Sequence, residues 1–159
     1  MKEFIELMLK KNKKIATMES CTGGGLANII TNIEGASEVF QFGVVTYSNE
    51  YKIKMGVPKE VIDNYTVYSM ETADAMAKAI SAFTNSDYGV GVTGKLNRQD
   101  SENRSGKNDV VYISIYNKET NQFSHETLTV EKQSREENKQ DVLACTTKIL
   151  MDVINRGDD

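Results

Sequence analysis

Three side chains in the first third of the sequence could together hydrolyse an amide or an ester: Ser37, Tyr47 and Lys52. A serine hydroxyl is a weak nucleophile and needs a base that takes its proton. The single histidine, His125, lies where apolar and polar residues alternate, a pattern typical of the water-facing side of a strand. A lysine can be the base instead, with the tyrosine as a relay, provided that burial keeps its amine neutral. The spacing in sequence does not show that the three residues are in contact. Tyr47 could instead be an aromatic residue of the core, and Lys52 a charged residue on the surface.

Residues 20–25 read Ser-Cys-Thr-Gly-Gly-Gly and join a short strand-like run to a segment of helical periodicity. Backbone N–H groups and the positive end of the helix dipole favour a phosphate or an oxyanion at such a junction. The segment lacks the Gly-Lys-Ser/Thr ending of a Walker loop and the Gly-x-Gly-x-x-Gly spacing of a dinucleotide site. A simple tight turn therefore stays an equal alternative to an anion site.

The elements that would position these residues follow from apolar periodicity. Helical spacing predicts helices over 4–9, 26–33, 59–64 and 70–83, and two further helices that start near residues 50 and 135. Runs of β-branched or alternating residues predict strands over 15–18, 43–47, 88–92, 110–116 and 123–130. Ser48 or Asn49, Ser69 and Ser134 are the expected N-caps. The last two strands should form an antiparallel hairpin. Helices that alternate with strands predict an α/β fold, a three-layer α/β/α sandwich with a mixed sheet.

Length and composition favour one domain and exclude several classes of function. The chain has 159 residues, 39% of them hydrophobic, which suffices for a single core over residues 1–159. The net charge of -4 argues against a nucleic-acid partner, and no apolar run reaches the roughly 20 residues of a membrane span. Two distant cysteines, Cys21 and Cys145, and one histidine support neither a disulfide framework nor a metal site. Because the N-terminus reads as a helix and not as a signal peptide, we expect a cytoplasmic protein.

Two long motifs in the first third of the chain resemble the CinA C-terminal family. Residues 18–24, Met-Glu-Ser-Cys-Thr-Gly-Gly, resemble the family's Ala-Glu-Ser-Cys-Thr-Gly-Gly signature. The family's next block is matched by residues 35–40 and 43–52 at the same spacing. Shorter matches follow over 54–58, 75–77, 92–94 and 135–138, so the resemblance covers nearly the whole chain.

The resemblance implies a hydrolase that converts nicotinamide mononucleotide and water to nicotinic acid mononucleotide and ammonia, without a metal or a cofactor. Ser37 matches the family's proposed nucleophile, Lys52 its general base and Tyr47 the assisting hydroxyl. The substrate-binding positions of the family are matched by Ser20, Thr22, Gly23, Gly24, Thr93 and Arg135. The implied partner is a small-molecule nucleotide, and we expect a homo-oligomer, as for many small enzymes.

One segment departs from the family pattern. Where the family reads Thr-Gly-Ile-Ala-Gly-Pro and continues with glycines, residues 93–98 read Thr-Gly-Lys-Leu-Asn-Arg. Residues 95–109 are polar and without periodicity, so we expect a loop that is disordered or displaced without ligand, and weak activity. Two other functions stay open: a nucleotide-binding relative that has lost catalysis, and a partner-binding protein of DNA uptake or repair, which the family's competence-linked name suggests.

Overall fold

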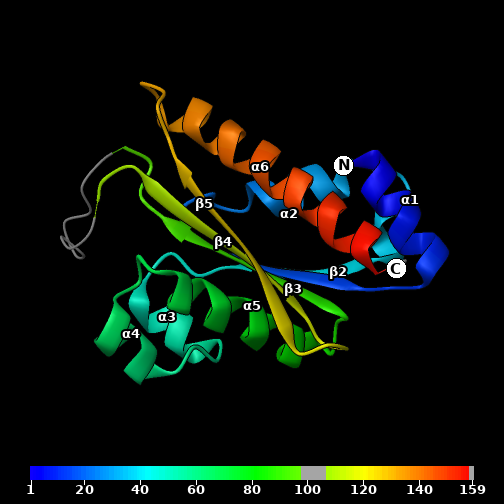
Figure 1. Cartoon of the computed structure of the whole chain (residues 1–159), viewed down its shortest axis with the longest axis horizontal. Helices are drawn as coiled ribbons and strands as arrows, with labels where there is room; N and C mark the ends of the chain where they lie inside the picture. Colours follow the sequence, from blue (N-terminus) through cyan, green and yellow to red (C-terminus); the bar gives the residue numbers. More distant parts are fainter. Residues whose placement is uncertain (98–106, 158–159) are drawn as a thin grey trace.

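A five-stranded sheet forms the centre of the protein, whose computed structural model describes residues 1–97 and 107–157. Its strands lie in the order β2-β1-β3-β4-β5 (Figure 1). They are β1 (Ile15–Glu19), β2 (Phe40–Val45), β3 (Tyr88–Gly94), β4 (Val110–Asn117) and β5 (Gln122–Thr129). β1 runs parallel to β2 and β3, whereas β3, β4 and β5 are successively antiparallel. The sheet is therefore mixed, and the carboxyl ends of β2, β1 and β3 lie along the same edge.

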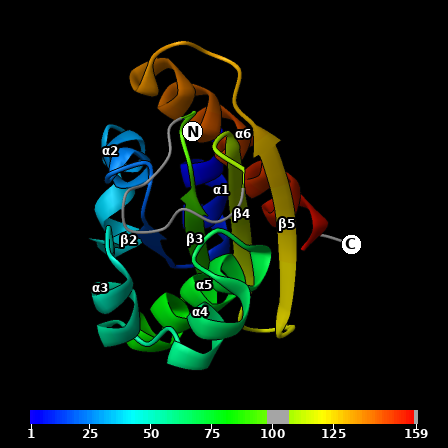
Figure 2. The same cartoon turned by 90° about the vertical axis from the view of Figure 1, so that its left-hand side faces the viewer.

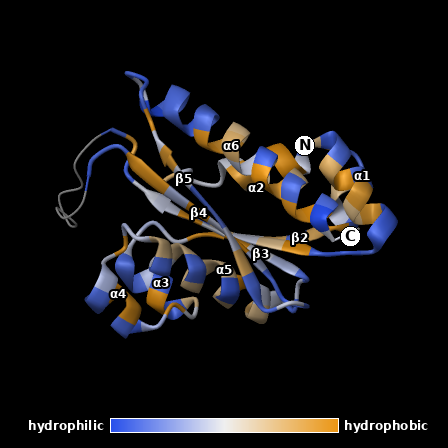
Figure 3. Cartoon of the chain, viewed as in Figure 1, coloured by the Kyte–Doolittle hydropathy of each residue, from blue (hydrophilic) through white to orange (hydrophobic). Residues whose placement is uncertain are grey.

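Helices cover both faces of the sheet (Figures 1 and 2). One face carries α1 (Lys2–Lys11), α2 (Gly25–Thr31) and α6 (Arg135–Arg156), and the other carries α3 (Asn49–Lys54), α4 (Lys59–Tyr65) and α5 (Met70–Thr84). Each face has its own apolar cluster, and the outward sides of the helices carry hydrophilic residues (Figure 3). Within the described part of the chain, no helix combines the length and the apolarity that crossing a membrane requires. The predicted three-layer α/β/α fold is confirmed.

The long helices and the helix after β2 begin at serine caps that the sequence predicts. The Oγ atoms of Ser48, Ser69 and Ser134 each accept a hydrogen bond from the amide three residues further on, at 3.2, 3.2 and 3.1 Å. Each bond satisfies one of the N–H groups that a helix start leaves without an intrahelical partner. The predicted hairpin is present as β4 and β5. His125 lies exposed on β5, as expected, with its Nε2 atom 2.6 Å from Asp74 Oδ1.

β2 begins three residues earlier than the sequence predicts and ends before Tyr47. A short 3-10 helix, η1 (Ala36–Glu38), precedes it. Phe40 pairs with Ile15 of β1, and burial alternates residue by residue from Phe40 on, so the Phe-Gln-Phe run before Gly43 belongs to the strand. Tyr47 therefore follows the strand at its carboxyl end, whereas Ser37 precedes it at the opposite end.

The polar segment predicted over 95–109 lies only partly within the described residues. Lys95 and Leu96 are buried, which contradicts the expectation of a displaced loop at its start. The Lys95 amide donates to the Val110 carbonyl at 3.1 Å, and Leu96 joins the apolar cluster under α1, α2 and α6. The expectation for residues 98–106 lies outside the described residues.

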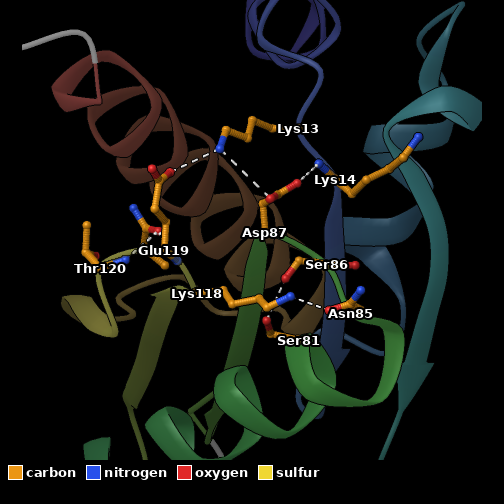
Figure 4. A network of polar contacts seen from close by, with 10 residues as sticks. Lys13, Lys14, Ser81, Asn85, Ser86, Asp87, Lys118, Glu119 and Thr120 are labelled. Carbon is orange, nitrogen blue, oxygen red and sulfur yellow. Dashed lines mark hydrogen bonds and ion pairs between the residues drawn. The ribbon is translucent and has the colours of Figure 1, made fainter.

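A polar network joins the amino-terminal ends of β1 and β3, at the edge opposite to Tyr47 (Figure 4). The Lys14 amide donates to Asp87 Oδ2 at 2.7 Å, and Lys13 Nζ donates to Glu119 Oε2 at 3.1 Å. The bond to Glu119 raises the pKa of Lys13. Lys14 Nζ also donates to the Glu38 carbonyl, so η1 is held at this same edge.

α5 packs directly on the backbone of β3 because the strand has glycines where the helix crosses it. A Cβ atom on Gly89 would lie 2.0 Å from the carbonyl oxygen of Ala77, and one on Gly91 would lie 2.2 Å from that of Ala73. Neither distance leaves room for a carbon atom. The glycines therefore set how closely the helix approaches the sheet.

Gly91→Ala should lower the free energy of unfolding by about 3 kcal/mol or more, because the added methyl group displaces α5 from β3. Gly157→Ala is the matched control, since there a Cβ would have its nearest neighbour at 3.6 Å and the backbone is α-helical with a φ of -69°. Urea denaturation followed by circular dichroism measures both changes. A Gly91→Ala protein as stable as the control would contradict this packing.

Candidate active site

Lys52 is the centre of a polar cluster at the edge where β2, β1 and β3 end. The residue is only 2% exposed, and its Nζ atom donates to Ser20 Oγ at 3.1 Å and to the Thr46 carbonyl at 2.7 Å. Ser20 follows β1 and Thr46 follows β2, while the Ser20 amide donates to the Val92 carbonyl of β3 at 2.9 Å. Three parallel strands therefore hold a serine hydroxyl against a buried amine.

The short helix α3 directs Lys52 back toward the sheet. The helix starts at the Ser48 cap directly after β2, and the Lys52 amide donates to the Ser48 carbonyl at 3.1 Å. Lys52 is the buried residue of α3, whereas its neighbours Tyr51 and Ile53 face outward. A lysine is rarely buried unless its nitrogen has polar partners, and here a hydroxyl and a carbonyl supply them.

A second buried ionisable group, Glu19, ends β1 beside this cluster. The residue is 1% exposed, and its carboxylate accepts from Thr22 Oγ1 at 2.7 Å, from the Leu26 amide at 2.7 Å and from the Ala27 amide at 3.1 Å. The two amides belong to the first turn of α2. The carboxylate thus occupies the helix end that the sequence suggested for a phosphate or an oxyanion. That part of the prediction is wrong, because the protein's own anion fills the position.

The loop between β1 and α2 keeps some of its backbone donors. The Gly23 amide donates to the Ser20 carbonyl at 3.0 Å, which closes the turn, and Gly23 has a left-handed φ of 62° that favours glycine. Within residues 1–97 and 107–157, no acceptor forms a hydrogen bond with the amides of Thr22 and Gly24. These loop amides, unlike those of α2, can still bind a ligand.

Cys21 follows Ser20 but is not a nucleophile near neutral pH. Burial raises the pKa of its thiol to about 12, although the positive charge of Lys52 acts in the opposite direction. The thiolate is the reactive form of cysteine, and it is almost absent under these conditions. The hydroxyl of Ser20 is therefore the nucleophile that the cluster offers.

The first half of α6 lies over the glycine loop. Arg135 Nη2 donates to the Tyr47 hydroxyl at 3.1 Å, and Lys139 Nζ would lie 3.5 Å from a Cβ atom on Gly23. Leu143 packs at Gly25, where a Cβ would lie 2.9 Å from its Cδ1 atom. Positions 135, 139 and 143 are four residues apart and so share one face of the helix. The sequence analysis missed Lys139, which this spacing from Arg135 could have indicated.

The family assignment rests on the match between the sequence and a family profile. The profile described as the CinA C-terminal domain matches residues 1–154. The chain belongs to this family. The predicted resemblance is thereby confirmed, and the motifs over 18–24 and 43–52 are the segments that meet at Lys52.

Curated relatives of this CinA-family chain are named competence-damage inducible proteins. One from Caldanaerobacter subterraneus is 50% identical over 91 residues, which cover 57% of this chain and 22% of the relative. One from Clostridium kluyveri is 39% identical over 113 residues, which cover 70% of this chain and 27% of the relative. The chain thus spans about a quarter of the length of the curated relatives it matches.

Solved structures of the CinA superfamily share the fold. A protein from Klebsiella pneumoniae superposes with a TM-score of 0.89 at 18% identity, covering 98% of this chain and 95% of that chain. The competence/damage inducible protein CihA from Agrobacterium tumefaciens gives a TM-score of 0.81 at 25% identity, covering 97% of this chain and 94% of that one. The similarity to the Klebsiella protein, at 18% identity, shows only that the two chains share a fold.

Ser37 is the predicted site residue that this CinA-family fold does not bring to Lys52. It lies exposed in η1, whose Glu38 is bonded by Lys14 at the start of β1. Lys52 instead contacts Ser20 at the end of β1. The six residues of β2 separate the two positions by about 20 Å. The predicted convergence of Ser37, Tyr47 and Lys52 is therefore wrong within one chain.

The other predicted residues lie at the carboxyl edge, but two of their hydroxyls have partners inside the protein. Thr93 Oγ1 donates to the Val67 carbonyl at 2.7 Å, so it tethers the segment before α5 to β3. The Thr22 hydroxyl donates to Glu19. Tyr47 is 64% exposed, and its hydroxyl meets Arg135 at the mouth of the cluster.

Glu19→Ala should lower the free energy of unfolding by about 3–5 kcal/mol, because three donors lose their acceptor at once. Glu19→Gln keeps the shape and one acceptor oxygen, so its loss should be intermediate. Glu34→Ala, at an exposed glutamate, is the matched control and should be nearly neutral. Urea denaturation ranks the three variants. Equal losses for Glu19→Ala and Glu34→Ala would contradict the structural role of this carboxylate.

Iodoacetamide at pH 8 should modify Cys145 much faster than Cys21. With a pKa of about 12 for the buried Cys21 thiol, its thiolate fraction at that pH is about one in 10⁴. Burial also raises the pKa of Cys145, but that residue is only half-buried. Mass spectrometry of tryptic peptides against time measures both rates. Faster labelling of Cys21 would mean that the loop between β1 and α2 opens readily.

Proposed function

We propose that this CinA-family domain is an amidohydrolase that converts nicotinamide mononucleotide and water to nicotinic acid mononucleotide and ammonia. The observation that carries the proposal is the contact between the buried Lys52 amine and the Ser20 hydroxyl, 3.1 Å apart. A serine that has a lysine as its base is a known arrangement for splitting acyl bonds without histidine or metal. The family resemblance supplies the substrate, and the geometry supplies the pair of reacting groups.

In the first half of the reaction, the Ser20 hydroxyl adds to the carboxamide carbon of the substrate. The neutral Lys52 amine takes the hydroxyl proton, and the Thr46 carbonyl, 2.7 Å from the same nitrogen, fixes its orientation. The proposal requires the neutral amine at this step, because an ammonium cannot accept the hydroxyl proton. The amides of Thr22 and Gly24 lie in the same loop and can donate to the oxyanion that forms.

In the second half, the C–N bond breaks and the amide nitrogen leaves as ammonia, after it has received the proton from Lys52. The product is an ester between Ser20 and the nicotinoyl group. Water then adds to this ester while the Lys52 amine takes one of its protons, and Ser20 regains its proton as the carboxylic acid leaves. The overall reaction consumes one water and releases one ammonia.

Tyr47 and Arg135 bind and orient the substrate in this proposal, at the exposed mouth of the cluster. Their contact at 3.1 Å joins the end of β2 to the start of α6, so the two residues form one polar rim. A guanidinium and a phenol hydroxyl both donate hydrogen bonds, which suits a substrate with phosphate and sugar oxygens.

Ser20→Ala and Lys52→Met should each reduce ammonia release from nicotinamide mononucleotide by about 10³-fold or more, because each removes a reacting group. Ser37→Ala is the matched serine control and should leave kcat/KM close to that of the wild type. A coupled ammonia assay measures the rates, and circular dichroism checks that each variant is folded. The opposite pattern, with activity lost only in Ser37→Ala, would contradict the Ser20 assignment.

A nucleotide-binding protein without catalysis is the second candidate. The observation in its favour is the departure at residues 93–98, where Lys95 and Leu96 are buried directly after β3. Such a protein would bind nicotinamide mononucleotide in calorimetry and release no ammonia at any enzyme concentration. Trapping the nicotinoyl ester on Ser20 by acid quench and peptide mass spectrometry would establish catalysis instead.

A further inference from the structure

Lys139 lies at the glycine loop, but nothing in the proposed chemistry uses it. Its Nζ atom would lie 3.5 Å from a Cβ atom on Gly23, so the ammonium faces the space that a side chain at position 23 would fill. Glycine leaves that space open. An atom of a ligand placed there would be within contact distance of the ammonium.

The charge of Lys139 has no ion-pair partner within residues 1–97 and 107–157. Among the described residues, no carboxylate forms an ion pair with Lys139, and no acceptor forms a hydrogen bond with its Nζ atom. The buried carboxylate of Glu19, which ends β1 before this loop, is occupied by one hydroxyl and two amides. The lysine is also only half exposed. A half-buried ammonium beside an open gap is suited to an anion.

Arg135 is one helical turn before Lys139 and contacts Tyr47 at the same mouth. Residues four apart on a helix have Cβ atoms about 5–6 Å apart, so one anion can lie near both cations. The positive charge of Arg135 also acts on the Cys21 thiol, which places it near the loop. Two cationic side chains of α6 therefore lie near the loop, although the whole chain has a net charge of -4.

We propose that Lys139, together with Arg135, binds the phosphate monoester of the substrate over Gly23 and so makes the site selective for nucleotides over nucleosides. This inference rests on the proposed function for its substrate. A phosphate dianion satisfies an ammonium as a point charge and a guanidinium through paired N–H donors. The phosphate lies on the α6 side of the loop, and the carboxamide reaches Ser20 beside Lys52.

The test compares Lys139→Met with Lys148→Met. Both remove one positive charge from α6, but Lys148 is exposed and lies nine residues further on, on the opposite side of the helix. Gly23 is not a suitable test position, because its left-handed φ of 62° strains any other residue. The substrates are nicotinamide mononucleotide and nicotinamide riboside, which lacks the phosphate.

Lys139→Met should lower kcat/KM for the nucleotide by about 10- to 100-fold, the effect of one charged hydrogen bond, and leave that for the riboside unchanged. Lys139→Arg should restore part of the nucleotide preference. Lys148→Met should behave as the wild type with both substrates. Equal loss of activity toward nucleotide and riboside, or no loss toward either, would overturn the proposal.

A binding measurement separates this inference from the proposed function. Calorimetry measures the binding of inorganic phosphate and of adenosine monophosphate without any turnover. Each of these two ligands should bind the wild type and Lys148→Met more tightly than it binds Lys139→Met. If the wild type binds phosphate through Lys139 but releases no ammonia, the proposed function fails and the phosphate site stands. If turnover occurs while phosphate binding ignores Lys139, only the phosphate site fails.

Discussion

The buried carboxylate of Glu19 is the interaction on which the candidate site depends. A carboxylate away from water is stable only where donors surround it, and the protein supplies one hydroxyl and two amides. These donors are the start of α2 and the loop before it. Glu19 therefore fixes the loop that follows β1, including the adjacent Ser20, more firmly than the glycines could. A loop with three glycines would otherwise have a large conformational entropy to lose.

The same carboxylate explains why the glycine loop does not act as a phosphate loop of the usual kind. The amides of Leu26 and Ala27, which would bind a phosphate at the helix start, already bind Glu19, so an external phosphate needs other donors. The cations near the loop are Arg135 and Lys139 of α6, the helix that follows the last strand of the sheet in sequence and packs over the loop. Charge at the site is thus arranged in two layers, with Glu19 and Lys52 buried below the loop and Arg135 and Lys139 above it.

Much of the fold could be predicted from the sequence because local signals decide it. The serine caps before α3, α5 and α6 and the alternation in β4 and β5 were sufficient. The pairing of Ser37 with Lys52 was wrong for a physical reason: motif spacing does not tell at which end of a strand a residue lies. Here Ser37 precedes β2 and Lys52 follows it, so the whole length of the strand separates them. The role of Glu19 as the anion of α2 was not predicted, because it depends on contacts that only the tertiary structure shows.

The topology explains why the three segments that form the site are so far apart in sequence. Only parallel strands bring successive carboxyl ends to one edge, and in this sheet these are β2, β1 and β3. β4 and β5 are antiparallel additions that lead the chain back to the start of α6. As β5 ends at the same edge as β1, α6 begins there, and its first turns can reach the loop after β1. β4 leads the chain away from the edge where β3 ends and β5 leads it back, so the hairpin widens the sheet and still lets α6 begin beside the loop after β1.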